Sequence, residues 1–254
     1  MKYRDKFLFD LINKYSDEIR LCYKLKEITK DEYNVRAKNF DGDTVLHVCA
    51  SKGFWFASGF LISLGADVNA VNKYNKTPLH LAAEKGYHVT AEVLLKNNAD
   101  PNVKNDRKQT PLFLAVANNF SFVSKILLEN GADPKKVNAQ FVSPLHVAAK
   151  NGNLEIVKQL VEAGAYMNGV DTSKRSPLHN AVYNSYYDIA KYLVAKGANY
   201  KIKDKKGMTP FEAGNKEFKS HCLQITAEKL ANGGDTRYNT YLVMNHSDIY
   251  DKEK

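Results

Sequence analysis

Thr77-Pro78-Leu79-His80-Leu81-Ala82-Ala83 is the most complete copy of a short motif that recurs along this chain of 254 residues. The copies begin 33 residues apart, at Thr44, Thr77, Thr110, Ser143, Ser176 and Thr209. A fixed period of this length indicates a stack of similar structural units rather than a single globular core. Such stacks usually bind partners and rarely catalyse reactions.

One unit of the repeat predicts two short helices. Thr77 can accept hydrogen bonds from free backbone amides at a helix start. Pro78 then occupies the first helical position, where its missing N–H costs nothing, and Gly86 ends the helix. A second helix follows, because Val89 and Val93 recur at helical spacing. Neither helix buries its apolar face alone, so the units must stack.

These residues resemble the ankyrin repeat family. The matching motifs are Thr-Pro-Leu-His at 77–80, Gly-Ala-Asp at 65–67 and 131–133, and Asp-Val-Asn at 67–69. The resemblance implies an all-α repeat solenoid, in which helix–turn–helix units stack and each carries a β-hairpin finger. It covers roughly residues 38 to 214, as units at 38–70, 71–103, 104–136, 137–169 and 170–202 and a partial unit at 203–214.

The two ends of the chain lack the motif. Residues 1–37 contain two apolar stripes at helical spacing, which predict an N-terminal helical cap. Residues 215–254 are expected to hold a C-terminal capping helix, within 216–231, and a tail. The sequence leaves open whether the tail is a short strand, a docking peptide or disordered.

Composition narrows the class of protein further. The formal net charge is +9, carried mostly by lysine, which fits either a basic binding surface or the codon usage of an AT-rich genome. No apolar run approaches the roughly 18 residues of a membrane span, and the first residues do not form a Sec-type signal peptide. Three widely separated cysteines fit a reducing compartment. We therefore expect a cytoplasmic protein, in the producing cell or in a host cell.

The four motif histidines are not expected to bind a metal. Equivalent atoms in stacked helices lie about 10 Å apart, whereas zinc needs ligands about 2 Å from one ion. The resemblance implies instead that His47, His80, His146 and His179 bond to neighbouring backbone. No cofactor motif and no catalytic motif occurs in the sequence, so we expect neither a cofactor nor an enzyme.

The family usually binds partners across its finger tips and first helices. The corresponding positions here include aromatic residues flanked by lysine and asparagine, a composition that suits an interface. Phe141 and Val142 stand out, because exposed apolar side chains on a finger have no role in folding; the alternative is that they pack on the adjacent finger. The predicted partner-binding residues are Phe40, Lys52, Lys73, Tyr74, Lys76, Lys85, Arg107, Asn118, Asn119, Phe141, Val142, Lys150, Arg175, Tyr183 and Lys205.

The second helices carry a further departure from the repeat. Units four and five have acidic residues three positions after the turn, Glu155 and Asp188, whereas the first three units have apolar ones. This predicts a second contact patch for a partner or for self-association, unless a local rotation of the helices buries the side chains. The patch comprises Trp55, Phe56, Val89 and Phe122.

The resemblance also implies a modification. In ankyrin repeats the asparagine that closes each unit can be hydroxylated by a host asparaginyl hydroxylase. The matching positions in this chain are Asn69, Asn102 and Asn168.

The sequence therefore predicts a monomeric, non-enzymatic scaffold or adaptor that binds a protein partner with an acidic surface on its concave face. Such a protein could be a secreted bacterial effector that acts on host proteins. The alternative is a substrate-recruiting or regulatory subunit of an enzyme complex of the transferase or ubiquitin ligase type. Nucleic acid is disfavoured as a partner, because specific base contacts use arginine forks and this chain is poor in arginine.

Overall fold

The computed structural model describes residues 3–15, 17–26, 34–214, 216 and 220. The chain forms two compact units, Met1–Ala139 and Gln140–Lys254. Apart from residues 216 and 220, the predicted closing helix at 216–231 and the tail lie outside the described residues.

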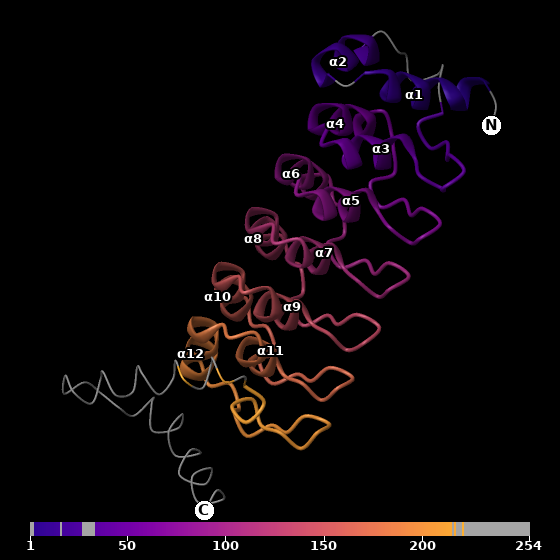
Figure 1. The fold of residues 1–254 in the computed structure, drawn as a ribbon. Coiled ribbons are helices and arrows are strands. Elements are labelled where there is room, and N and C mark those ends of the chain that lie inside the picture. The colour runs from indigo at the N-terminus through magenta and orange to yellow at the C-terminus, as the bar shows by residue number, and fades with distance from the viewer. Residues whose placement is uncertain (1–2, 16, 27–33, 215, 217–219, 221–254) are drawn as a thin grey trace, which may run out of the picture. The chain divides into compact units, whose positions relative to one another are not determined.

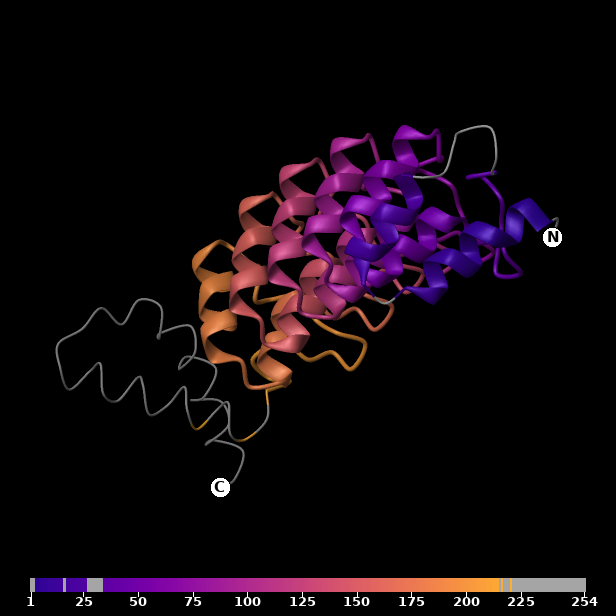
Figure 2. The ribbon, with the colours of Figure 1, turned by 90° about the horizontal axis from the view of Figure 1, so that it is seen from above.

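The first unit consists of helices packed in two rows (Figures 1 and 2). The inner row is α1, α3, α5 and α7, each packed on the one before it, and the outer row is α2, α4, α6 and α8. The bounds are α1 Tyr3–Lys14, α2 Glu18–Lys26, α3 Val45–Lys52, α4 Trp55–Ser63, α5 Pro78–Lys85, α6 His88–Lys96, α7 Pro111–Ala117 and α8 Ser121–Glu129.

The second unit repeats this arrangement with four helices in its described residues, α9 Pro144–Asn151, α10 Leu154–Glu162, α11 Pro177–Tyr183 and α12 Tyr187–Ala195. Inner helix α9 packs on α11, and outer helix α10 packs on α12. Residues 210–213 form a turn where a further inner helix would begin, which agrees with the weak sixth copy of the motif.

Small side chains explain the close packing of the inner helices. Leu79, Ala82 and Ala83 of α5 are fully buried. Gly86 ends α5 with φ +80°, and the Phe120 ring lies so close that a Cβ at residue 86 would stand 2.7 Å from it. A glycine is needed here for both reasons, since an L side chain disfavours this backbone conformation and would also collide with the ring.

The fingers are tight turns that begin at an asparagine or aspartate. In the second finger, residues 72–76, Oδ1 of Asn72 accepts hydrogen bonds from the backbone N–H groups of Tyr74 and Lys76, and Asn75 has φ +53°. The N–H of Asp106 in the third finger, residues 105–109, bonds to the carbonyl of Tyr74. Within the described residues the only strand-like pairing is an isolated bridge between Lys38 and Thr44, because side-chain acceptors take the N–H groups that a strand ladder would use.

Each motif histidine joins its own repeat to the next finger. In the second repeat, Nδ1 of His80 accepts the N–H of Thr77 at 3.1 Å, and Nε2 donates to the carbonyl of Gln109 at 3.1 Å. His47, His146 and His179 make the same pair of contacts, reaching the carbonyls of Lys76, Arg175 and Met208. Both ring nitrogens are engaged, so these histidines are structural. Phe113 takes this place in the third repeat and is buried without such a bond.

Burial keeps these imidazoles neutral. It lowers the pKa of His80 to about 4 and also lowers the pKa values of His47, His146 and His179. The contact from the N–H of Thr77 acts in the same direction, because a protonated Nδ1 would place two donors against each other.

The stack should therefore lose stability as the pH falls from about 6.5 to 4. The unfolded chain binds a proton at His80 near pH 6.5 while the folded chain does so near pH 4, so stability rises with pH across this window. The difference corresponds to about 3 kcal/mol for this one residue. Thermal unfolding followed at pH 7, 6, 5 and 4 tests this. His80→Phe, which copies the third repeat, should show a shallower decline than the wild type, and equal declines would contradict the assignment.

Candidate functional site

The candidate binding surface consists of the finger tips and the C-terminal ends of the inner helices. Aromatic side chains at Phe40, Tyr74, Phe141 and Tyr183 are all exposed there. Backbone hydrogen bonds and the motif histidines hold the fingers in place, so the backbone from which these side chains extend has a defined position.

Phe141 occupies an unfavourable position in the second unit. Its side chain is 61% exposed, and its φ of +59° lies in the left-handed region. Bulky residues rarely adopt this conformation. The equivalent residues of the other fingers, including Gly42, Asn75 and Gly207, share the positive φ, so the turn imposes the conformation and Phe141 accepts its cost.

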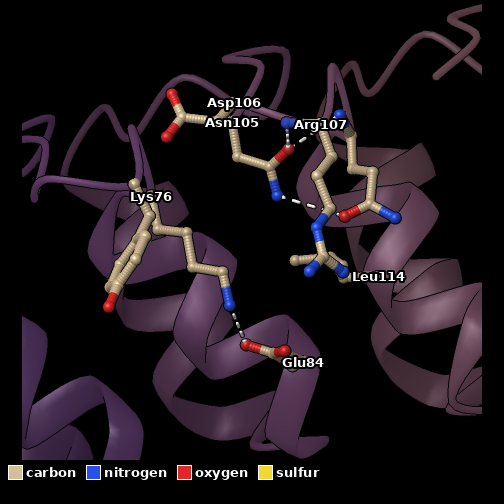
Figure 3. A pocket seen from close by; sticks show the side chains of 8 residues that line it. Lys76, Glu84, Asn105, Asp106, Arg107 and Leu114 are labelled. Carbon is tan, nitrogen blue, oxygen red and sulfur yellow. Dashed lines mark hydrogen bonds and ion pairs between the residues drawn. The ribbon is translucent and has the colours of Figure 1, made fainter. Parts of the chain in front are cut away.

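A pocket of about 370 Å³ lies in the first unit between the second and third fingers. Figure 3 shows its lining from α5, α7 and the two fingers. The residues are Tyr74, Lys76, Glu84, Asn105, Asp106, Arg107, Gln109 and Leu114.

The charges in this pocket are unevenly compensated. Nζ of Lys76 lies 2.7 Å from a carboxylate oxygen of Glu84, and the two side chains are 23% and 33% exposed. Asp106 accepts a hydrogen bond from the amide of Asn75, and its carboxylate points away from the guanidinium of Arg107 in Figure 3. That guanidinium has no hydrogen bond or ion pair with any described residue.

The second unit has a smaller pocket of about 140 Å³ at the same position of the repeat. Here the guanidinium of Arg175 lies over the ring of Tyr183, 5.4 Å from its centroid, an arrangement that favours a cation–π interaction. Lys206 and Met208 of the last finger line the other side. Arg175 therefore corresponds to Lys76 in the repeat, but it stacks on an aromatic ring instead of pairing with an acid.

Three predicted binding residues have structural contacts of their own. Nζ of Lys52 donates to the carbonyl of Ile12 in α1, so this lysine ties the N-terminal helices to the first repeat. The amide of Asn118 donates to the carbonyl of Leu114 in its own helix. Asn119 has φ +61° and takes the turn position that Gly86 holds one repeat earlier.

The other predicted residues lie at the surface, and their role in binding stays a prediction. Lys73 pairs with Asp41, which raises the pKa of the lysine, and its ammonium lies 5.0 Å from the centroid of the Tyr74 ring. Val142 is half-buried. Lys85, Lys150 and Lys205 are exposed, and so is the whole side chain of Phe40.

The predicted second patch lies at the surface of the outer row of the first unit. Trp55, Phe56, Val89 and Phe122 are 39% to 74% exposed, so no rotation of the helices buries them. Trp55 and Phe56 pack edge to face, with ring centroids 5.7 Å apart. Their use as a contact patch stays a prediction.

The three asparagines predicted as hydroxylation sites link successive repeats. Nδ2 of Asn102 donates to the carbonyl of Gly131 and its Oδ1 accepts from the N–H of Asp133, both at 2.9 Å. Asn69 makes the same pair of contacts to the next turn, and Oδ1 of Asn168 accepts from the N–H of Asn199. Hydroxylation stays a prediction, and an enzyme would have to act on amides that already hold two repeats together.

Glu84, Gln109 and Met208 line the pockets and lie at positions of the repeat where the sequence places the binding face. The lining residues that the sequence did not place there are Asn105, Asp106 and Leu114 in the first unit and His179, Asp204, Lys206, Glu212 and Ala213 in the second. The 33-residue register is a signal that could have found part of this set, because Asn105 and Leu114 hold the same positions of the repeat as Asp204 and Ala213. The pairing of Lys76 with Glu84 has no such signal, since other repeats carry different residues there.

Helix pairs stacked with fingers define a solenoid of the interaction-domain type. The family model for ankyrin repeats matches residues 14–105, 60–139 and 112–204, so the chain belongs to the ankyrin repeat family. It is similar in fold to the crystal structure of the ankyrin repeat domain of Bcl-3, described as a unique member of the IkappaB protein family, with 24% identity, a TM-score of 0.72, and coverage of 83% of this chain and 93% of that one. None of the curated proteins compared with the chain matches it.

The described residues include neither a metal-binding cluster nor a membrane-spanning helix. No group of three or more histidine, cysteine, aspartate or glutamate side chains there is placed to hold a metal ion. Among the same residues, no helix has the length and apolar character needed to cross a membrane.

The linking role of Asn102 can be tested by its replacement with alanine. Asn102→Ala removes two hydrogen bonds between successive repeats and should lower stability by about 1–2 kcal/mol, seen as a lower midpoint of thermal unfolding. Asn97→Ala is the matched control, because the Asn97 amide bonds only to Val93 in its own helix. Equal losses in the two variants would show that Asn102 has no special part in joining the repeats.

Proposed function

We propose that this protein is a non-enzymatic adaptor that binds a protein partner across its finger tips and inner helices. Proteins of the ankyrin repeat family are generally interaction domains. The single observation that carries the proposal for this chain is Phe141, which is unfavourable in the free protein in two independent ways.

The first cost is conformational, since a non-glycine residue whose backbone is held at φ +59° destabilises the folded state by about 1 kcal/mol or more. The second is solvation, because 61% of an aromatic side chain faces water. Gly42 and Gly207 occupy the same place in other fingers without either cost. A partner that buries the Phe141 ring would offset both, as buried aromatic anchors do at protein interfaces.

The charge of the neighbouring fingers supports an acidic partner. Asp171 and Asp204 direct their Oδ1 atoms at backbone N–H groups within their own fingers, so these carboxylates are used internally. Lys174, Lys205 and Lys206 are exposed. The fingers of the second unit therefore present cations outward, and such a surface attracts acidic proteins.

Two settings suit such an adaptor, a secreted effector that acts on host proteins and a recruiting subunit of an enzyme complex. Truncation after Gly214 separates them. An effector module of this kind keeps its main partner without residues 215–254, whereas a recruiting subunit that docks through that segment loses its enzyme. The measurement is co-purification of each partner with the full and the truncated chain.

Replacing Phe141 by glycine should separate binding from folding. Phe141→Gly relieves the left-handed backbone and removes little buried surface, so we expect a thermal midpoint equal to or above that of the wild type. Capture of the partner from self and host-type lysates should fall by about tenfold or more, which corresponds to roughly 1.4 kcal/mol of binding free energy.

Lys174→Gly is the matched control, because Lys174 has φ +57° at the same place in the next finger. It should retain the partner to within a factor of about two, since it removes no aromatic anchor. A large fall in the thermal midpoint of Phe141→Gly would show that the ring packs internally and would remove the main support for the proposal.

A further inference from the structure

The backbone of Arg107 is held by hydrogen bonds, whereas its guanidinium has no polar partner among the described residues. Its N–H donates to Oδ1 of Asn105, and its carbonyl accepts from the N–H of Ala139. Among the described residues nothing forms a hydrogen bond or an ion pair with the guanidinium. Figure 3 shows this group directed toward Leu114, inside the pocket between the second and third fingers.

The repeat does not require an arginine at this place. The equivalent positions in other fingers are Asp41, Tyr74, Gln140, Ser173 and Lys206. All share the turn geometry, so Arg107 contributes nothing to the turn that other side chains do not. Arg107 is exposed and lines the pocket, so its guanidinium is accessible to a ligand there.

The ion pairing in the pocket favours a monoanion. The lining carries two cations, Lys76 and Arg107, and two carboxylates, Glu84 and Asp106. Lys76 pairs with Glu84 at 2.7 Å, and the carboxylate of Asp106 bonds to Asn75 and points away from Arg107, so the positive charge of Arg107 has no ion-pair partner in the pocket. A carboxylate would neutralise this charge, and the planar guanidinium can bind it through two parallel hydrogen bonds. A phosphate dianion would place excess negative charge close to Glu84 and Asp106, which is unfavourable.

The shape of the pocket suits a side chain that carries its carboxylate on methylene groups. Leu114 is buried at its base, and the half-exposed ring of Tyr74 also lines it. These surfaces can pack against an aliphatic stem while the carboxylate meets Arg107. The volume of about 370 Å³ has room for one side chain and the adjoining main chain of an extended segment.

We propose that this pocket is a subsite for one glutamate or aspartate side chain of the protein partner, bound through Arg107. The inference rests on the proposed function and deepens it, because it names one chemical group that the partner must supply. It concerns the first unit alone, whereas the Phe141 argument concerns the second.

The test is a titration followed by NMR on the full chain. The probes are three capped pentapeptides, Ala-Ala-Glu-Ala-Ala and its counterparts with glutamine or phosphoserine at the centre. The glutamate peptide should shift the side-chain Nε–Hε signal of Arg107 in a saturable manner, and the glutamine peptide should not. Arg107→Gln should weaken binding of the glutamate peptide by about tenfold, as expected for a charge-assisted pair.

Lys108→Asn is the matched control. It removes the same unit of charge from the adjacent residue, which does not line the pocket, and asparagine tolerates the φ of +57° at that position. Binding of the glutamate peptide should persist in this variant. Equal weakening by Lys108→Asn and Arg107→Gln would overturn the proposal in favour of general electrostatic attraction, and tighter binding of the phosphoserine peptide would overturn the choice of a carboxylate.

Failure of this subsite and failure of the proposed function give different results. If capture of the partner depends on Phe141 while the glutamate peptide leaves Arg107 unchanged, the adaptor function stands and the subsite falls. If the peptide binds at Arg107 but capture is indifferent to Phe141, the pocket stands as an anion site and the argument from Phe141 falls. Circular dichroism of Arg107→Gln, expected to match the wild type, shows that the variant is folded.

Discussion

The rest of this structure depends on neutral imidazoles that are hydrogen-bonded at both ring nitrogens. In the second repeat one nitrogen of His80 fixes the start of α5 and the other holds the carbonyl of Gln109, so a single side chain sets the position of the next finger relative to the helix. His47 holds the carbonyl of Lys76 in the same way. The two fingers on either side of the pocket in Figure 3 are therefore each bonded to a buried histidine through a backbone carbonyl, and these bonds fix the position of the binding surface. Preformed surfaces of this kind bind with little cost in ordering.

The third repeat lacks two of the polar side chains that link successive repeats elsewhere in the chain. Phe113 has no ring nitrogen, and Lys135, which follows Asn69 and Asn102 in the repeat, has no amide oxygen. Neither can make the hydrogen bonds of its counterparts, whereas apolar packing is retained because Phe113 is buried. The division of the chain into compact units falls between Ala139 and Gln140, a few residues after Lys135. In repeat proteins stability is approximately a sum of local and nearest-neighbour terms, so the third repeat lacks two polar contributions that the second repeat has.

Local rules account for what the sequence predicted well. The start of α5 at Pro78 and its end at Gly86 follow from a hydroxyl cap, a proline at the first position and a glycine with positive φ, all of which act over a few residues. The contacts of long side chains are harder to predict from the sequence, because they depend on the distances between groups that belong to separate elements. Lys52 reaches α1 and Lys76 reaches Glu84, while Arg107 reaches no described partner, although all three looked alike as basic residues at binding positions. The register located the surface, but only the three-dimensional arrangement separated paired cations from the unpaired one.

In a repeat protein, a residue that does not suit its position is informative, because the other copies show which backbone conformation that position adopts. The left-handed turn position is filled by Gly42, Asn75, Lys108, Phe141, Lys174 and Gly207. Glycine and asparagine suit this conformation, and a lysine there at least keeps its charge in water. Phenylalanine disfavours the left-handed backbone conformation, and its apolar ring is exposed to water at this position. The ring of Phe141 is therefore not part of the buried core. In the proposed function, contact with a partner supplies the favourable free energy that offsets both terms, as buried aromatic anchors do at protein interfaces.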